Sequence, residues 1–72
     1  MKFKEFYDEY TREVKKIIKD IERLIFMVET TNALDSIEKI YVKDYLESAR
    51  SKLRDTIDEL ETYKIMLGEE DL

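Results

Sequence analysis

Leucine recurs at every seventh position in the second half of the chain, and this repeat limits the possible folds more than any other feature. The four residues are Leu46, Leu53, Leu60 and Leu67. Side chains seven residues apart lie on one face of an α-helix, two turns from each other. The repeat therefore predicts a long helix that packs against another helix.

The first half of the chain carries a matching apolar stripe, in which the steps alternate between four and three residues. The stripe consists of Phe3, Tyr7, Tyr10, Val14, Ile17, Ile21, Leu24 and Val28. In heptad notation it alternates between positions d and a, beginning with d at Phe3. In the second half the leucines occupy a, and position d is occupied by Val42, Ala49, Thr56 and Tyr63. The two stripes predict an all-α fold, an antiparallel two-helix hairpin of coiled-coil type.

Weak helix formers and capping residues indicate where the helices begin and end. Residues 30–32 form the only cluster of weak helix formers in the middle of the chain, and one uninterrupted helix is the less favoured alternative to a turn there. Either Asn32 or Asp35 caps the second helix, the latter with Glu38 in a capping box, and Gly68 ends it. We expect one hairpin domain over 1–72, with helices at about 3–30 and 36–67, a turn at about 31–35 and an acidic tail at 68–72.

A hairpin this small has difficulty burying its apolar residues alone. The chain of 72 residues has neither cysteine nor histidine, so neither a disulfide nor a thiolate or imidazole zinc site can supplement the core. Several large apolar residues also lie outside the expected a/d seam. We therefore predict a homodimer that forms a four-helix bundle, with a dimer contact at Ile18, Ile25, Tyr45 and Ile57.

A second apolar surface is expected at the turn end of the first helix. Residues 24–28 are apolar all round the helix, which places Phe26 and Met27 partly outside the seam, and Ile65 is a similar exception on the second helix. Cover of both ends of the bundle by the chain turns and a neighbouring subunit is the favoured explanation, and docking of another protein is the alternative. The most favoured function is a non-enzymatic module for self-association and protein–protein interaction or regulation.

A basic ridge on the outer face of the first helix gives the main alternative, an RNA- or DNA-binding regulator. We favour pairing of these cations with neighbouring carboxylates, because no aromatic residue alternates with them for base stacking. The ridge consists of Arg12, Lys15, Lys16, Lys19 and Arg23.

Catalytic chemistry has little support in the sequence. Without histidine and cysteine the chain cannot form a Ser-His or Cys-His nucleophile pair, and it has no glycine-rich phosphate loop. Asp55, Asp58 and Glu59 could hold magnesium in a nucleotide hydrolase, but a solvated, ion-paired helix face explains them better. We expect that the protein is not an enzyme and that it binds neither a cofactor nor a metal.

Net charge and hydropathy give an expectation about the surroundings of the protein. The net charge of −5 disfavours general binding to nucleic acid or anionic membranes. No apolar run approaches the roughly 20 residues that cross a bilayer. We expect a cytoplasmic protein without membrane contact. Few thermolabile residues and many Lys and Glu residues are a weak indication of a thermophilic source.

Overall fold

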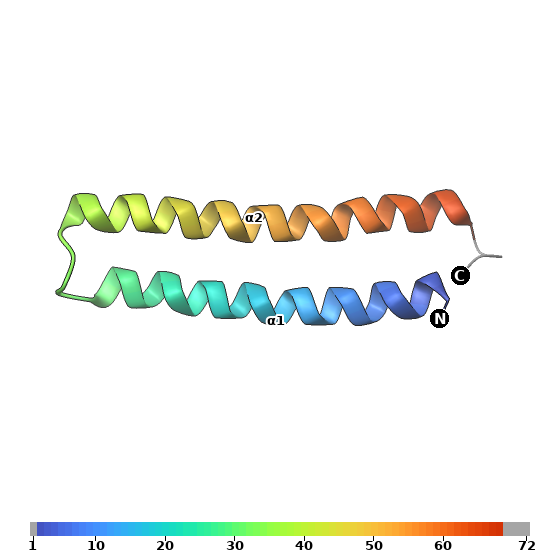
Figure 1. Ribbon diagram of the computed structural model, residues 1–72, viewed down its shortest axis with the longest axis horizontal. Helices are drawn as coiled ribbons and strands as arrows, with labels where there is room; N and C mark the ends of the chain where they lie inside the picture. Colours follow the sequence, from blue (N-terminus) through green and yellow to red (C-terminus); the bar gives the residue numbers. More distant parts are fainter. Residues whose placement is uncertain (1, 69–72) are drawn as a thin grey trace.

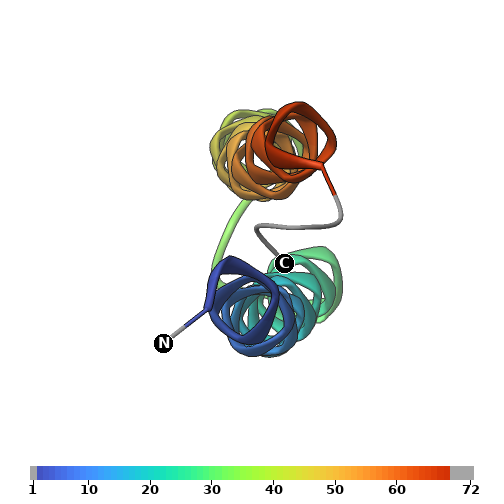
Figure 2. The same cartoon turned by 90° about the vertical axis from the view of Figure 1, so that its right-hand side faces the viewer.

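The computed structural model describes residues 2–68 and shows two helices packed against each other. Helix α1 spans Phe3–Thr30 and helix α2 spans Ser36–Leu67, and the described residues contain no strand. The helices run antiparallel along a body of 54 × 16 × 11 Å, with the turn at one end (Figure 1). The predicted all-α helical hairpin is confirmed. Seen end-on, the helices form a single pair, so each has only one helical neighbour (Figure 2).

A capping box begins α2. The Asp35 carboxylate accepts a hydrogen bond from the Glu38 N–H at 2.8 Å, and the Glu38 carboxylate accepts one from the Asp35 N–H at 2.9 Å. These two bonds satisfy amide groups that lack a partner within the helix. Of the two residues expected to cap α2, the chain thus uses Asp35. At the other end α2 stops at Gly68, whose φ of 75° favours glycine. The acidic tail at 69–72 lies outside the described residues.

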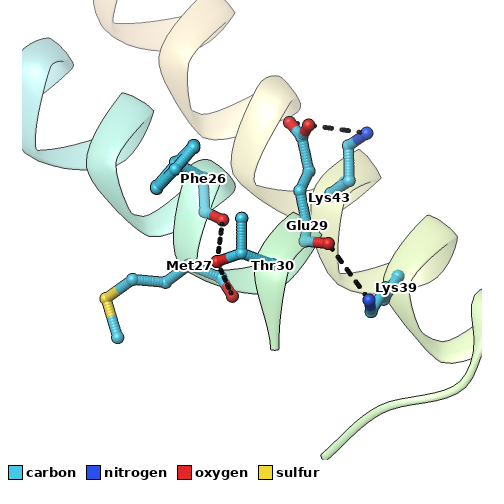
Figure 3. A network of polar contacts seen from close by, with 6 residues as sticks. All are labelled: Phe26, Met27, Glu29, Thr30, Lys39 and Lys43. Carbon is cyan, nitrogen blue, oxygen red and sulfur yellow. Dashed lines mark hydrogen bonds and ion pairs between the residues drawn. The ribbon is translucent and has the colours of Figure 1, made fainter. Parts of the chain in front are cut away.

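Side chains from both helices bind the carbonyl groups at the end of α1 (Figure 3). The Thr30 hydroxyl donates to the carbonyl oxygen of Phe26 at 2.9 Å. Lys39, which belongs to α2, donates from its ammonium group to the carbonyl oxygen of Glu29 at 3.1 Å. A cation is favourable at the negative end of a helix dipole. The turn is therefore stabilised by a contact from α2 as well as by local bonds.

The seam between the helices is rotated relative to the predicted a/d seam. The buried side chains are Val14, Ile18, Ile21 and Ile25, which occupy positions a and e of α1. The expectation that Ile18 and Ile25 lie outside the seam is therefore wrong. Ile17, which was expected inside it at position d, is 46% exposed.

Helix α2 accounts for this rotation. Its d position is small or polar at Ala49 and Thr56, which offer α1 little apolar area to bury. Its e position carries the long stems of Lys43 and Arg50, which can cover apolar surface while their charged heads stay in water. Helix α1 consequently turns its e residues toward α2.

The capping box generates a prediction about stability. Asp35→Ala should lower the free energy of unfolding by about 1 kcal/mol, because the first turn of α2 loses its cap. Asn32→Ala is the matched control, since Asn32 was the rival cap, and it should change the free energy of unfolding much less. Urea unfolding followed by circular dichroism, at one fixed protein concentration, measures both. Equal losses in the two variants would contradict the role of Asp35.

Candidate functional site

The two long sides of the helix pair carry different side chains. Along one side, ion pairs join α1 to α2 across the seam. Glu22 of α1 pairs with Arg50 of α2 at 3.6 Å, and Glu29 pairs with Lys43 at the same distance. Figure 3 shows the second of these pairs next to the turn. Near the termini the Lys64 ammonium lies 4.9 Å from the centre of the Tyr7 ring. We call this side the ion-paired edge.

The opposite edge is apolar and open. The Tyr10 hydroxyl donates to Thr56 Oγ1 at 2.7 Å, and Thr56 Oγ1 donates to the Leu53 carbonyl oxygen at 2.6 Å. Because Tyr10 and Thr56 both occupy position d, their contact places the d rows of both helices on the same side of the seam. We call this row the apolar edge. It consists of Tyr10, Ile17 and Leu24 from α1 and of Val42, Ala49, Thr56 and Tyr63 from α2.

Much of the apolar edge is exposed to solvent. Leu24 and Tyr63 are each 45% exposed, and Val42 is 38% exposed. A nearby charge also acts on the edge: Glu59 raises the pKa of the Tyr63 phenol, mainly through a side-chain hydrogen bond and then through charge repulsion of the phenolate. The edge is therefore an extended apolar surface in water, with the Glu59 carboxylate beside Tyr63 on α2.

On each helix a row of residues at position g borders the apolar edge. Position g follows position d by three residues, and residues three apart are neighbours on a helix surface. These flanking rows are apolar near both ends of the hairpin and charged in the middle. The rows are Phe6, Glu13, Asp20 and Met27 on α1, and Tyr45, Lys52, Glu59 and Met66 on α2.

The structure distributes the predicted interface residues over three environments. Ile18 and Ile25 are buried in the seam of their own hairpin, and Ile57 is half-buried. Met27 and Tyr45 are exposed beside the apolar edge. The remaining two, Phe26 and Ile65, are exposed at position f, away from the apolar edge. Contact of any of these seven residues with a partner stays a prediction.

The predicted basic ridge is exposed along α1. Lys16 donates to the Glu13 carboxylate at 3.2 Å, and Arg23 pairs with Asp20. Two of the five cations thus have carboxylate partners one turn away. Arg12, Lys15 and Lys19 are exposed as well. The sequence predicts pairing of these cations with neighbouring carboxylates, and two of them show it. Binding of nucleic acid by the ridge stays a prediction.

The carboxylates considered for magnesium are exposed side chains of α2. Within residues 2–68 no three potential metal ligands come together, and Asp55, Asp58 and Glu59 are therefore not gathered into one cluster. No pocket is present in that part of the chain. Neither described helix combines the length and the apolar character needed to span a membrane.

Comparison with models of protein families, with curated proteins and with solved structures gave no match to this chain.

The hydrogen bond across the apolar edge generates a second prediction. Tyr10→Phe should cost about 1 kcal/mol of unfolding free energy, since it removes the bond to Thr56 while the ring stays. Tyr7→Phe is the control, because the Tyr7 ring contacts Lys64 through its face and the substitution keeps that ring. Urea unfolding of both variants at equal concentration tests the difference. A loss for Tyr7→Phe as large as that for Tyr10→Phe would contradict it.

Proposed function

We propose that this protein is a non-enzymatic helical module that self-associates through the apolar edge to form a four-helix bundle. The observation that carries the proposal is the difference between the two edges. Ion pairs such as Glu22–Arg50 cover the seam on one side, whereas Ile17 and Leu24 leave it uncovered on the other. A surface of this kind marks a site of association.

The small core of the hairpin supports the proposal. Among the described residues only four apolar side chains are buried, all on α1, while fourteen large apolar side chains are exposed. Burial of apolar surface is the main favourable contribution to folding. The hairpin alone gains little from it, because most of its large apolar side chains stay in water. Pairing of two hairpins would bury the apolar edge and add to the core of each.

The size of the surface also suits a second copy. The long face of the body measures 54 Å by 16 Å. That area is close to the roughly 800 Å² that each partner buries in a stable interface of standard size. The edge runs along most of both helices, as one side of a four-helix bundle does. A second hairpin of the same length and pattern would cover it.

The absence of an enzyme function belongs to the same proposal. The chain has no histidine and no cysteine, which supply most nucleophile–base pairs. Carboxylates and lysines alternate on the outer faces, where they interact with each other. We propose the cytoplasm as the location of the protein, and the lack of cysteine agrees with it.

The exposed residues at position f would stay outside such a bundle. Phe26 is 65% exposed, and Ile65 is 75% exposed. We propose these residues, together with Met27 near the turn, as the surface for a further protein partner, in line with the enrichment of aromatic residues and methionine at interfaces.

Two neighbouring substitutions test the self-association. Leu24→Asp places a carboxylate on the apolar edge and should raise the dimer dissociation constant at least a hundredfold, because the charge loses water on association. Phe26→Asp adds the same charge two residues away at position f and should change the constant less than threefold. Sedimentation equilibrium over a wide range of concentration gives both constants.

The wild type must form a dimer for the proposal to stand. Circular dichroism of each variant above and below its dissociation constant separates loss of association from loss of helix. A monomeric wild type, or equal effects of Leu24→Asp and Phe26→Asp, would disprove association through the apolar edge.

A further inference from the structure

The two rows of the apolar edge differ in side-chain size. Helix α1 contributes three large residues, Tyr10, Ile17 and Leu24. Helix α2 contributes the small residues Ala49 and Thr56 at the middle of its row. Well-packed cores place large side chains opposite small ones, because equal sizes leave either overlaps or voids. The orientation of a second copy is therefore constrained by which row it meets.

The turn and the Tyr10–Thr56 hydrogen bond show which residues of the two helices lie at the same level along the hairpin. Helix α1 ends at Thr30 where α2 begins at Ser36, and Tyr10 lies level with Thr56. The long side chains of the ion pairs lean toward the N-terminus of their own helix and therefore join residues at different levels.

Because the helices are antiparallel, two residues earlier on α1 corresponds to two residues later on α2. Counting from Tyr10 and Thr56, Ile17 therefore lies level with Ala49, and Leu24 lies level with Val42. In the flanking rows Glu13 lies within one residue of the level of Lys52.

Two hairpins can stack on their apolar edges in two symmetric ways. With the two-fold axis parallel to the helices, both turns lie at the same end, and α1 packs on α2 of the partner. With the axis perpendicular to the helices, the turns lie at opposite ends, and α1 packs on α1 of the partner. Both are closed two-fold arrangements, so symmetry alone does not choose between them.

Resting on the proposed self-association, we infer that the second copy binds with its turn at the same end, so that α1 of each copy packs on α2 of the other. Ile17 and Leu24 then lie against the row that contains the partner's Ala49 and the partner's Thr56. Large residues meet small ones on both sides of the bundle. This matching of size is the first observation behind the inference.

The levels of the residues agree with the same-end arrangement. Levels along the helices are kept in this arrangement, so Ile17 meets the partner's Ala49 and Tyr10 meets the partner's Thr56. In the flanking rows Glu13 comes within one residue of the level of the partner's Lys52, where opposite charges attract.

The opposite-end arrangement matches less well. When the middle of α1 packs on itself, Ile17 meets the partner's Ile17, and on the other side Ala49 lies beside the partner's Ala49. Large residues then crowd one side of the bundle while small ones leave space on the other. Glu13 comes within one residue of the level of the partner's Asp20, where like charges repel.

The contact of Glu13 supplies a sharp test. In the same-end arrangement Glu13 lies beside the partner's Lys52, so Glu13→Lys should convert two attractive pairs into repulsive ones and weaken the dimer about two- to tenfold. In the opposite-end arrangement Glu13 lies beside the partner's Asp20, and the same substitution would tighten the dimer. Glu9→Lys makes the same change in net charge outside the flanking rows and is the control. Weakening in Glu13→Lys beyond that in Glu9→Lys supports the inference, and tightening overturns it.

A distance measurement gives an independent answer. Ala33 is exposed in the turn, and the chain has no cysteine, so Ala33→Cys allows one spin label per copy. Double electron–electron resonance should give a distance below about 30 Å between the two spin labels if the turns lie together, since adjacent helices are about 10 Å apart. Turns at opposite ends would be more than about 40 Å apart, because each residue adds 1.5 Å to a helix. The long distance would overturn the inference.

Sedimentation equilibrium of the labelled Ala33→Cys protein separates the two possible failures. A dimer with the long distance refutes only the orientation and leaves self-association intact. A monomer refutes self-association and the orientation with it.

Discussion

Each helix in this protein has only one helical neighbour, and the other features of the structure depend on that constraint. A helix with apolar residues at a, d and e presents a stripe wider than one partner can cover. The partner in the same chain covers a and e of α1, where Val14, Ile18, Ile21 and Ile25 are buried. Position d is left at the edge of the contact. The exposed apolar edge is thus the part of the stripe that a two-helix fold does not cover.

The ion-paired edge decides which side of the hairpin is left open. An exposed pair such as Glu29–Lys43 contributes only about 0–1 kcal/mol to stability. Its larger effect is geometric, because the stems of Lys43 and Arg50 lie across the seam and exclude water from one side of it. A second hairpin approaching that side would displace charged groups from water. The same interactions therefore stabilise the fold and direct association to the opposite edge.

The sequence predicts the hairpin because the heptad repeats and the helix-ending residues agree with each other. It leaves the cap of α2 undecided between Asn32 and Asp35, and the geometry of Glu38 decides it. The sequence does not predict which part of the stripe faces α2, since Ile17 and Ile18 are both apolar and adjacent. The signal for the rotation of the seam lies in α2, in its small d residues and in the long basic stems at its e position. The stripe of α1 alone predicts a seam at a and d, and it does not reveal the apolar edge.

The polar groups of the apolar edge show how this surface could be buried at low cost. An unpaired hydroxyl that loses water on association costs free energy, and a hydroxyl with a partner inside its own chain costs much less. The Tyr10 hydroxyl donates to Thr56, and the Thr56 hydroxyl donates to the Leu53 carbonyl oxygen. Two of the three hydroxyls on the edge, those of Tyr10 and Thr56, are thus satisfied within the hairpin. An incoming surface then needs only to match the edge in shape, and an apolar helix face of similar length meets that requirement.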